Sequence, residues 1–121
     1  MIHRRDIFAA VLGLAVIAAP AVAFAGNPHV DAAVRETKEA IHEGKQHMFS
    51  SFVEHTHNAL DHAREAHAQG VDPKKHVSTA IRHLRDALKV AKHTQSTHRL
   101  NSGIQHAERA LVHLKVVANE H

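Results

Sequence analysis

The chain has 121 residues and a formal net charge of +3, with 15 histidines but no cysteine, tryptophan or tyrosine. The absence of cysteine excludes disulfides, zinc fingers and c-type haem attachment, and it argues against a dedicated Cu(I) site because soft ligands are nearly missing. Lys and Arg are scattered rather than clustered, so nucleic acid is not an expected partner.

Residues 1–25 have the pattern of an export signal. Arg4 and Arg5 are followed by the apolar run 7–19, a proline and the small-x-small sequence 23–25. The run is shorter than the roughly 20 residues that a membrane-spanning helix needs. We therefore expect a signal peptide over 1–25, a single domain over 26–121, a periplasmic location and no stable membrane association after cleavage. The arginine pair leaves open whether export uses the Sec or the twin-arginine route.

Four segments of the predicted domain carry apolar or small residues at alternating spacings of four and three, the heptad pattern of bundle helices. These stripes comprise Val30, Val34, Thr37, Ile41, Gly44 and Met48; Phe49, Val53, Thr56, Leu60 and Ala63; Val77, Ile81, Leu84, Leu88 and Ala91; and Leu100, Ile104, Ala107, Leu111, Leu114 and Ala118. Short connections favour an all-α fold, an antiparallel up-down four-helix bundle.

Some helix boundaries can be predicted from the sequence. Gly70 suits the position after a helix C-cap, and Asp72 followed by Pro73 suits an N-cap with proline at the first helical position. The polar run 94–97 separates the third helix from the fourth. The first junction, over 44–51, is compatible either with a tight turn or with a kinked continuous helix.

The two halves of the domain repeat. The pattern His-x-x-x-Ala-Leu-x-His occurs at 55–62 and again at 106–113, and Glu39-Ala40-Ile41-His42 corresponds to Asp86-Ala87-Leu88-Lys89. A duplicated helical hairpin explains this repeat, with a second junction four residues longer than the first.

The histidines fall at regular heptad positions when the stripe residues are labelled a and d. Two histidines seven residues apart on one helix are separated by about 10.5 Å along the axis, so they cannot share a metal ion. Each therefore needs a partner one turn away or on another helix. His67 falls on the apolar stripe, where we expect a packed, hydrogen-bonded side chain rather than a ligand. Seven others fall at position c, off the stripe, where we expect solvent-accessible ladders: His29, His55, His62, His76, His83, His106 and His113.

Histidine–carboxylate pairs one helical turn apart are expected metal sites, because imidazole and carboxylate together suit Cu(II), Ni(II) and Zn(II). The pairs are Glu43–His47 and His57–Asp61 at a spacing of four, and Glu39–His42, Glu54–His57, His62–Glu65 and His83–Asp86 at three. The bundle topology would also gather histidines at each end: His42, His47, His93 and His98 at one, and His29, His67, His76, His113 and His121 at the other.

With these features, the chain resembles the small metal-binding protein family, His-rich periplasmic copper-binding proteins. The resemblance rests on His29-Val30-Asp31-x-Ala33-Val34, Glu39-Ala40-Ile41-His42-x-Gly44-Lys45, Glu54-His55-x-x-x-Ala59-Leu60-x-His62-Ala63 and Ala110-Leu111-x-His113-Leu114. It implies a four-helix bundle that binds several Cu(II) ions, and other divalent metals less selectively, for storage or detoxification. The chain departs from this pattern with Lys89 at the repeat position of His42.

We therefore expect a monomeric, non-enzymatic chelator of divalent metal ions that binds several Cu(II) and also Ni(II) and Zn(II). The expected ligands are His29, His42, His47, His55, His57, His62, His76, His83, His93, His98, His106, His113, Glu39, Glu43, Glu54 and Asp61. A ferritin-like di-metal carboxylate protein is an alternative, because the helices at 39–42 and 54–57 each carry Glu-x-x-His. A copper metallochaperone with a docking partner and a pH-responsive charged surface are further alternatives.

Overall fold

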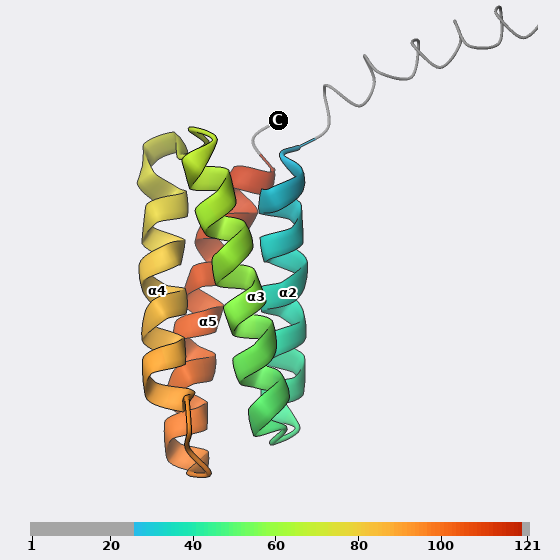
Figure 1. The fold of residues 1–121 in the computed structure, drawn as a ribbon, viewed down its shortest axis with the longest axis vertical. Coiled ribbons are helices and arrows are strands. Elements are labelled where there is room, and N and C mark those ends of the chain that lie inside the picture. Colours follow the sequence, from blue (N-terminus) through green and yellow to red (C-terminus); the bar gives the residue numbers. More distant parts are fainter. Residues whose placement is uncertain (1–25, 120–121) are drawn as a thin grey trace, which may run out of the picture.

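The computed structural model describes residues 26–119, and the regular structure in this range is entirely helical. The predicted signal peptide and His121 lie outside the described residues. Within 26–119, no helix combines the length and the apolar character that crossing a membrane requires. Four long helices lie side by side (Figure 1), which confirms the all-α, four-helix prediction. They are α2 (Pro28–Lys45), α3 (Phe49–Ala68), α4 (His76–Ala91) and α5 (Thr97–Ala118), with a short 3-10 helix η1 (Pro73–Lys75) before α4.

The helices form two closely packed pairs, α2 with α3 and α4 with α5, and the pairs meet through α2 against α5 and α3 against α4. In Figure 1 the α2–α3 and α4–α5 turns lie at the lower end of the bundle, and the α3–α4 connection lies at the upper end. This arrangement brings the start of α2, the end of α3, the start of α4 and the end of α5 to one end.

The core follows the predicted stripes but is shifted towards heptad position g. Residues at d, such as Val30, Leu84 and Leu114, are fully buried. Several residues at a, such as Val34 and Ile81, are only half buried. The position-g residues are buried as well, although the predicted stripes did not include them. These are Ala33, Ala40, Phe52, Ala59, Ala66, Ala80, Ala87, Gly103, Ala110 and Val117.

The junction between α2 and α3 is a tight turn rather than a kinked continuous helix. His47 adopts a left-handed conformation with φ of 63°. Its backbone N–H donates to the Gly44 carbonyl at 2.9 Å, and that of Met48 donates to Glu43 at 3.1 Å. This is a Schellman ending with histidine where glycine is usual. Met48 is 44% exposed, so its predicted place on the buried stripe is wrong, because the helix has already ended.

The connection from α3 to α4 agrees with the sequence at one position and differs at another. Gly70 follows the α3 C-cap with φ of 83°, as predicted. However, α4 begins at His76 rather than at Pro73, because Lys74 and Lys75 are left-handed and interrupt the helix. Asp72 still caps α4 from a distance, since its carboxylate accepts the backbone N–H groups of Val77 and Ser78.

Phe52 makes the two halves of the core unequal. Among residues 26–119 it is the largest fully buried side chain, and its counterpart in the second half is Gly103. A Cβ placed on Gly103 would lie 3.1 Å from the Phe52 ring, and one on Gly44 would lie 2.8 Å from it. One phenylalanine therefore fills the space next to both glycines.

Candidate metal centre

The seven histidines at position c lie half buried along the two helix pairs. The prediction that their side chains are open to solvent is therefore corrected. Position c is one turn from position g, about 40° around the helix. Because most g residues are small and buried, paired helices approach closely and bring their c side chains together. The remaining described histidines are exposed: His42, His47, His57, His67, His93 and His98.

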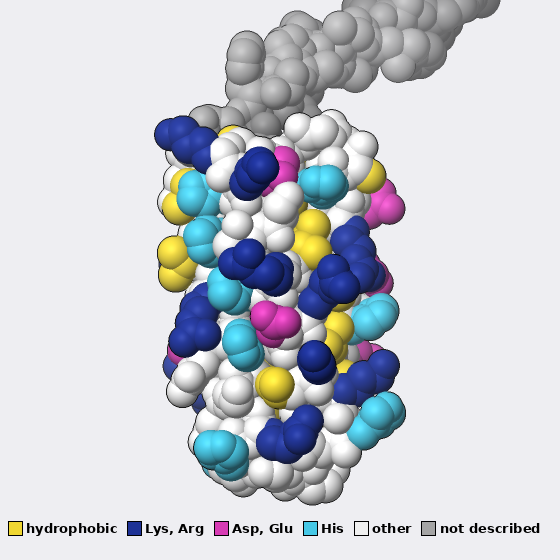
Figure 2. All heavy atoms as spheres, turned by 90° about the vertical axis from the view of Figure 1, so that its left-hand side faces the viewer, with side chains coloured by type: hydrophobic (Ala, Val, Ile, Leu, Met, Phe, Trp, Pro, Cys, Tyr) yellow, Lys and Arg dark blue, Asp and Glu magenta, His cyan; other side chains and the backbone are white. Residues whose placement is uncertain are grey.

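The α4 and α5 pair carries an imidazole cluster made of His76, His83, Asp86, His106 and His113. His76 Nδ1 lies 2.8 Å from His113 Nδ1, and their ring centroids are 5.1 Å apart. The His83 ring lies 6.1 Å from the rings of both His113 and His106. Figure 2, viewed from the α4 side, shows histidine side chains following one another down the bundle surface among Lys and Arg side chains.

Three members of the imidazole cluster have metal-ligand spacing. One ligand atom from each of His83, Asp86 and His106 lies within 4.8 Å of the other two. Metal–ligand bonds of about 2.0–2.2 Å need only small side-chain rotations from this arrangement. The Nδ1 atoms of His83 and His106 are buried with no hydrogen-bond partner in the described structure. Because an unpartnered buried polar atom costs about 1–3 kcal/mol, the donor set is suited to a bound cation.

Burial favours the neutral form of two imidazoles of this cluster, those of His83 and His113. It lowers the pKa of His83, and the nearby charges of Arg82 and His106 lower it further. Burial likewise lowers the pKa of His113, with contributions from His76 and Arg82. A neutral imidazole has a free lone pair, so these side chains are available to a metal ion near pH 7.

The α2 and α3 pair carries a mixed cluster of imidazoles and carboxylates. His29 Nδ1 lies 3.2 Å from His62 Nδ1, repeating the contact between His76 and His113. His55 Nδ1 lies 2.8 Å from Glu36 Oε1, and His55 Nε2 lies 3.6 Å from Glu43 Oε1.

The two clusters differ in proton affinity. The hydrogen bond between Glu36 and His55 raises the pKa of His55 and lowers that of Glu36. The counterpart of Glu36 in the second half is His83, whose pKa is lowered instead. The two hairpins therefore present related positions with different chemistry.

Of the histidine–carboxylate pairs expected one turn apart, two form contacts or clusters. His57 Nδ1 lies 3.4 Å from Asp61, with both side chains more than half exposed. His83 and Asp86 share the three-ligand group described above. His42 contacts Gln46 at 2.9 Å instead of its predicted partner Glu39.

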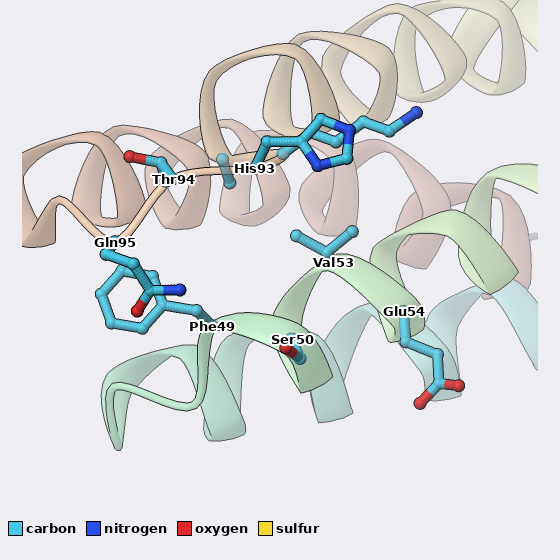
Figure 3. A pocket seen from close by; sticks show the side chains of 9 residues that line it. Phe49, Ser50, Val53, Glu54, His93, Thr94 and Gln95 are labelled. Carbon is cyan, nitrogen blue, oxygen red and sulfur yellow. The ribbon is translucent and has the colours of Figure 1, made fainter.

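The remaining predicted ligands lie at the bundle surface. His42, His47, His93 and His98 share one end of the bundle by helix position, but the group His83, Asp86 and His106 is the one three-ligand cluster found over residues 26–119. Glu54 and His93 line a groove with a volume of about 380 Å³, together with Phe49 and Val53. Figure 3 shows the Glu54 carboxylate directed away from His93, so these two side chains do not form a pair.

His67 is not packed as expected. Its side chain is 52% exposed, and its Nε2 lies 3.6 Å from Asp72 Oδ2. Asp86 was predicted as the metal-binding partner of His83, and both residues belong to the three-ligand group. Glu36 was not predicted as a ligand, although it occupies position c in the first helix.

The inward-facing carboxylate site of a ferritin-like protein needs Glu-x-x-His motifs that point into the bundle. Glu39, His42, Glu54 and His57 are instead all exposed. Their positions do not match that site.

Half-buried imidazoles at ligand spacing, grouped with a carboxylate and carried on packed helices, define a metal-binding protein. The family model described as small metal-binding protein matches residues 3–117, and the chain belongs to this family. The resemblance inferred from the sequence is thus confirmed. None of the curated proteins compared with the chain matches it.

Proposed function

We propose that the protein is a non-enzymatic chelator that holds several divalent metal ions, chiefly Cu(II), for storage, buffering or detoxification in the periplasm. The observation that carries this proposal is the imidazole cluster, where ligand atoms of His83, Asp86 and His106 lie within 4.8 Å of one another. Membership of the small metal-binding protein family supports metal as the cargo.

The donor atoms and their spacing favour copper among the divalent metals. Nitrogen and oxygen sites bind Cu(II) more tightly than Ni(II) or Zn(II). A metal ion with bonds of about 2.0 Å to two nitrogens that lie 2.8 Å apart subtends an angle of about 90°. His76 and His113 are so spaced, which suits adjacent positions in the tetragonal geometry of Cu(II).

The proposal includes the export and assembly of the protein. The signal peptide is removed after Ala25, and the mature domain is a monomer without stable membrane association. It folds as an antiparallel up-down bundle built from a duplicated hairpin. The repeat of His29–His62 and His76–His113, each joining the start of one helix to the end of the next, supports this architecture.

The test is a metal titration of the protein purified after export, with the N-terminus determined by mass spectrometry. Calorimetry and native mass spectrometry at pH 7.5 should show several Cu(II) per chain over a range of affinities, with Ni(II) and Zn(II) weaker. Replacing both His76 and His113 with alanine should reduce capacity more than replacing the exposed His57 and His98. A single site of one affinity, or a preference for iron, would contradict the proposal.

A further inference from the structure

The mixed cluster of α2 and α3 contains an imidazole held between two carboxylates. Glu36 lies at Nδ1 of His55, at 2.8 Å, and Glu43 lies at Nε2, at 3.6 Å. The three side chains are 26%, 23% and 24% exposed, in the order His55, Glu36 and Glu43. Glu36 and Glu43 lie on α2 and His55 lies on α3, so the packing of these two helices brings the three side chains together.

The two contacts of His55 are chemically different. The 2.8 Å contact at Nδ1 is a hydrogen bond, in which the ring N–H donates to Glu36. Neutral His55 then has its lone pair on Nε2, facing a carboxylate oxygen of Glu43. Two electron-rich atoms face each other at 3.6 Å, so this position is suited to a positive charge, either a proton or a metal ion.

The distance fits a bridging metal ion. With bonds of about 2.0–2.1 Å to nitrogen and oxygen, a separation of 3.6 Å corresponds to an angle of about 120° at the metal. This is roughly 10–20° wider than the tetrahedral angle, so a small approach of the two side chains would give tetrahedral geometry. The carboxylate at the other ring nitrogen matches the orienting group that metal-ligating histidines commonly have, which fixes the tautomer and increases the basicity of the ligand.

We propose that His55 Nε2 and Glu43 bind a borderline divalent cation, with Glu36 as the positioning residue that holds the Nδ1–H tautomer. This inference rests on the proposed chelator function and adds a site of a second class, in which carboxylate replaces imidazole. Glu39, one turn before Glu43 on α2, adds negative charge that acts on His55. Metal binding displaces any proton on Nε2 and leaves the proton on Nδ1 in place.

The internal repeat assigns this site to the first hairpin alone. The counterparts of Glu36 and Glu43 in α4 are His83 and Val90. At the Val90 position the chain makes a different contact, because Arg99 donates a hydrogen bond to the Val90 carbonyl at 2.8 Å. The second hairpin therefore has no carboxylate at either of these two positions.

The experiment is a Zn(II) titration of the exported protein with ¹⁵N-labelled histidine at pH 7.5, followed by long-range ¹H–¹⁵N spectra of the imidazoles. We expect the His55 Nε2 resonance to move to a metal-bound position while Nδ1 stays protonated. Glu43→Gln should weaken Zn(II) binding at His55 at least tenfold. Glu36→Gln should weaken it by about 10- to 100-fold and abolish the single Nδ1–H tautomer, a readout that a merely structural role would not move.

Glu108→Gln is the matched control. It removes the same charge from an exposed glutamate of α5 that is not among the expected ligands and that contacts Lys45 at 3.4 Å, so binding at His55 should change less than twofold. If His83 and His106 respond to Zn(II) while His55 does not, this inference is overturned and the chelator proposal stands. Unchanged His55 binding in Glu43→Gln would overturn the ligand assignment. No response from any histidine would overturn both proposals.

Discussion

Replacing His83 with leucine should destabilise the metal-loaded protein relative to the parent without destabilising the metal-free protein. His83 packs half buried between α4 and α5, and its Nδ1 is buried without a hydrogen-bond partner in the described structure. Leucine keeps most of the packing volume and removes the unpartnered nitrogen. We therefore expect the metal-free His83→Leu protein to be as stable as the parent or more stable by about 1 kcal/mol.

With metal the variant is destabilised, because a ligand is lost. Removing an outer-shell group alone costs about 10- to 100-fold in metal affinity, so losing a direct ligand should cost about 100-fold or more. At a free metal concentration 100 times the parent Kd, this site stabilises the parent by about 2.7 kcal/mol and the variant by about 0.4 kcal/mol. The difference of about 2.3 kcal/mol corresponds to a loss of about 9–18 °C in the metal-induced rise of Tm.

The assay is thermal unfolding followed by circular dichroism at 222 nm, with and without Cu(II). The matched control is His57→Ala, which removes an exposed histidine in contact with Asp61 and should retain nearly the full metal-induced rise. The reasoning is refuted if His83→Leu keeps the parental rise in Tm, or if the control loses as much as His83→Leu does.

Three further predictions follow from particular contacts. Gly44→Ala should destabilise the fold by about 1–3 kcal/mol in urea denaturation, because the new Cβ would lie 2.8 Å from Phe52; a smaller residue at Phe52 should restore part of the loss. His47→Gly should stabilise by about 1 kcal/mol, since it relieves the left-handed φ of 63°, and a fall in copper capacity would show that His47 is a ligand after all. Glu36→Gln should destabilise most at pH 4.5–6.5, and the loss should become smaller as the pH rises through the raised pKa of His55. The raised pKa of His55 stabilises the fold below the ordinary value of 6.5, and this stabilisation is lost as the pH rises through the raised value. The lowered pKa of Glu36 stabilises the fold above the ordinary value of 4.5. Equal losses of stability in denaturation at pH 5.5 and 8.5 would contradict this account.

The helices and several of their ends could be predicted from local patterns. The alternating spacing of apolar residues indicates the helical period. Gly70 marks the end of α3 through its left-handed backbone, and Ser96 marks the start of α5 through its side chain, which accepts the backbone N–H of Arg99. The failure at Pro73 has a local cause too, because two consecutive left-handed residues, Lys74 and Lys75, are not anticipated from lysine's preferences.

The metal clusters depended on information that no single helix contains. Heptad position c was correctly assigned to His76 and His113, but their 2.8 Å contact requires two helices to approach closely. That approach is set by the small residues at position g, such as Ala80 and Ala110, which the a and d pattern does not include. Pairs within one helix were therefore predicted in preference to pairs between helices.

The different chemistry of the two halves also arises from packing. Glu36 and His83 occupy equivalent positions, and the residue type at each can be read from the sequence. Their effects on pKa depend on the partner helix, which places His55 against Glu36 and other imidazoles against His83. The periodicity of apolar residues is a local property, so the order of residues in the chain is enough to predict the helices. The distances between ligands and the proton affinities depend on atoms that come into contact only when the helices pack.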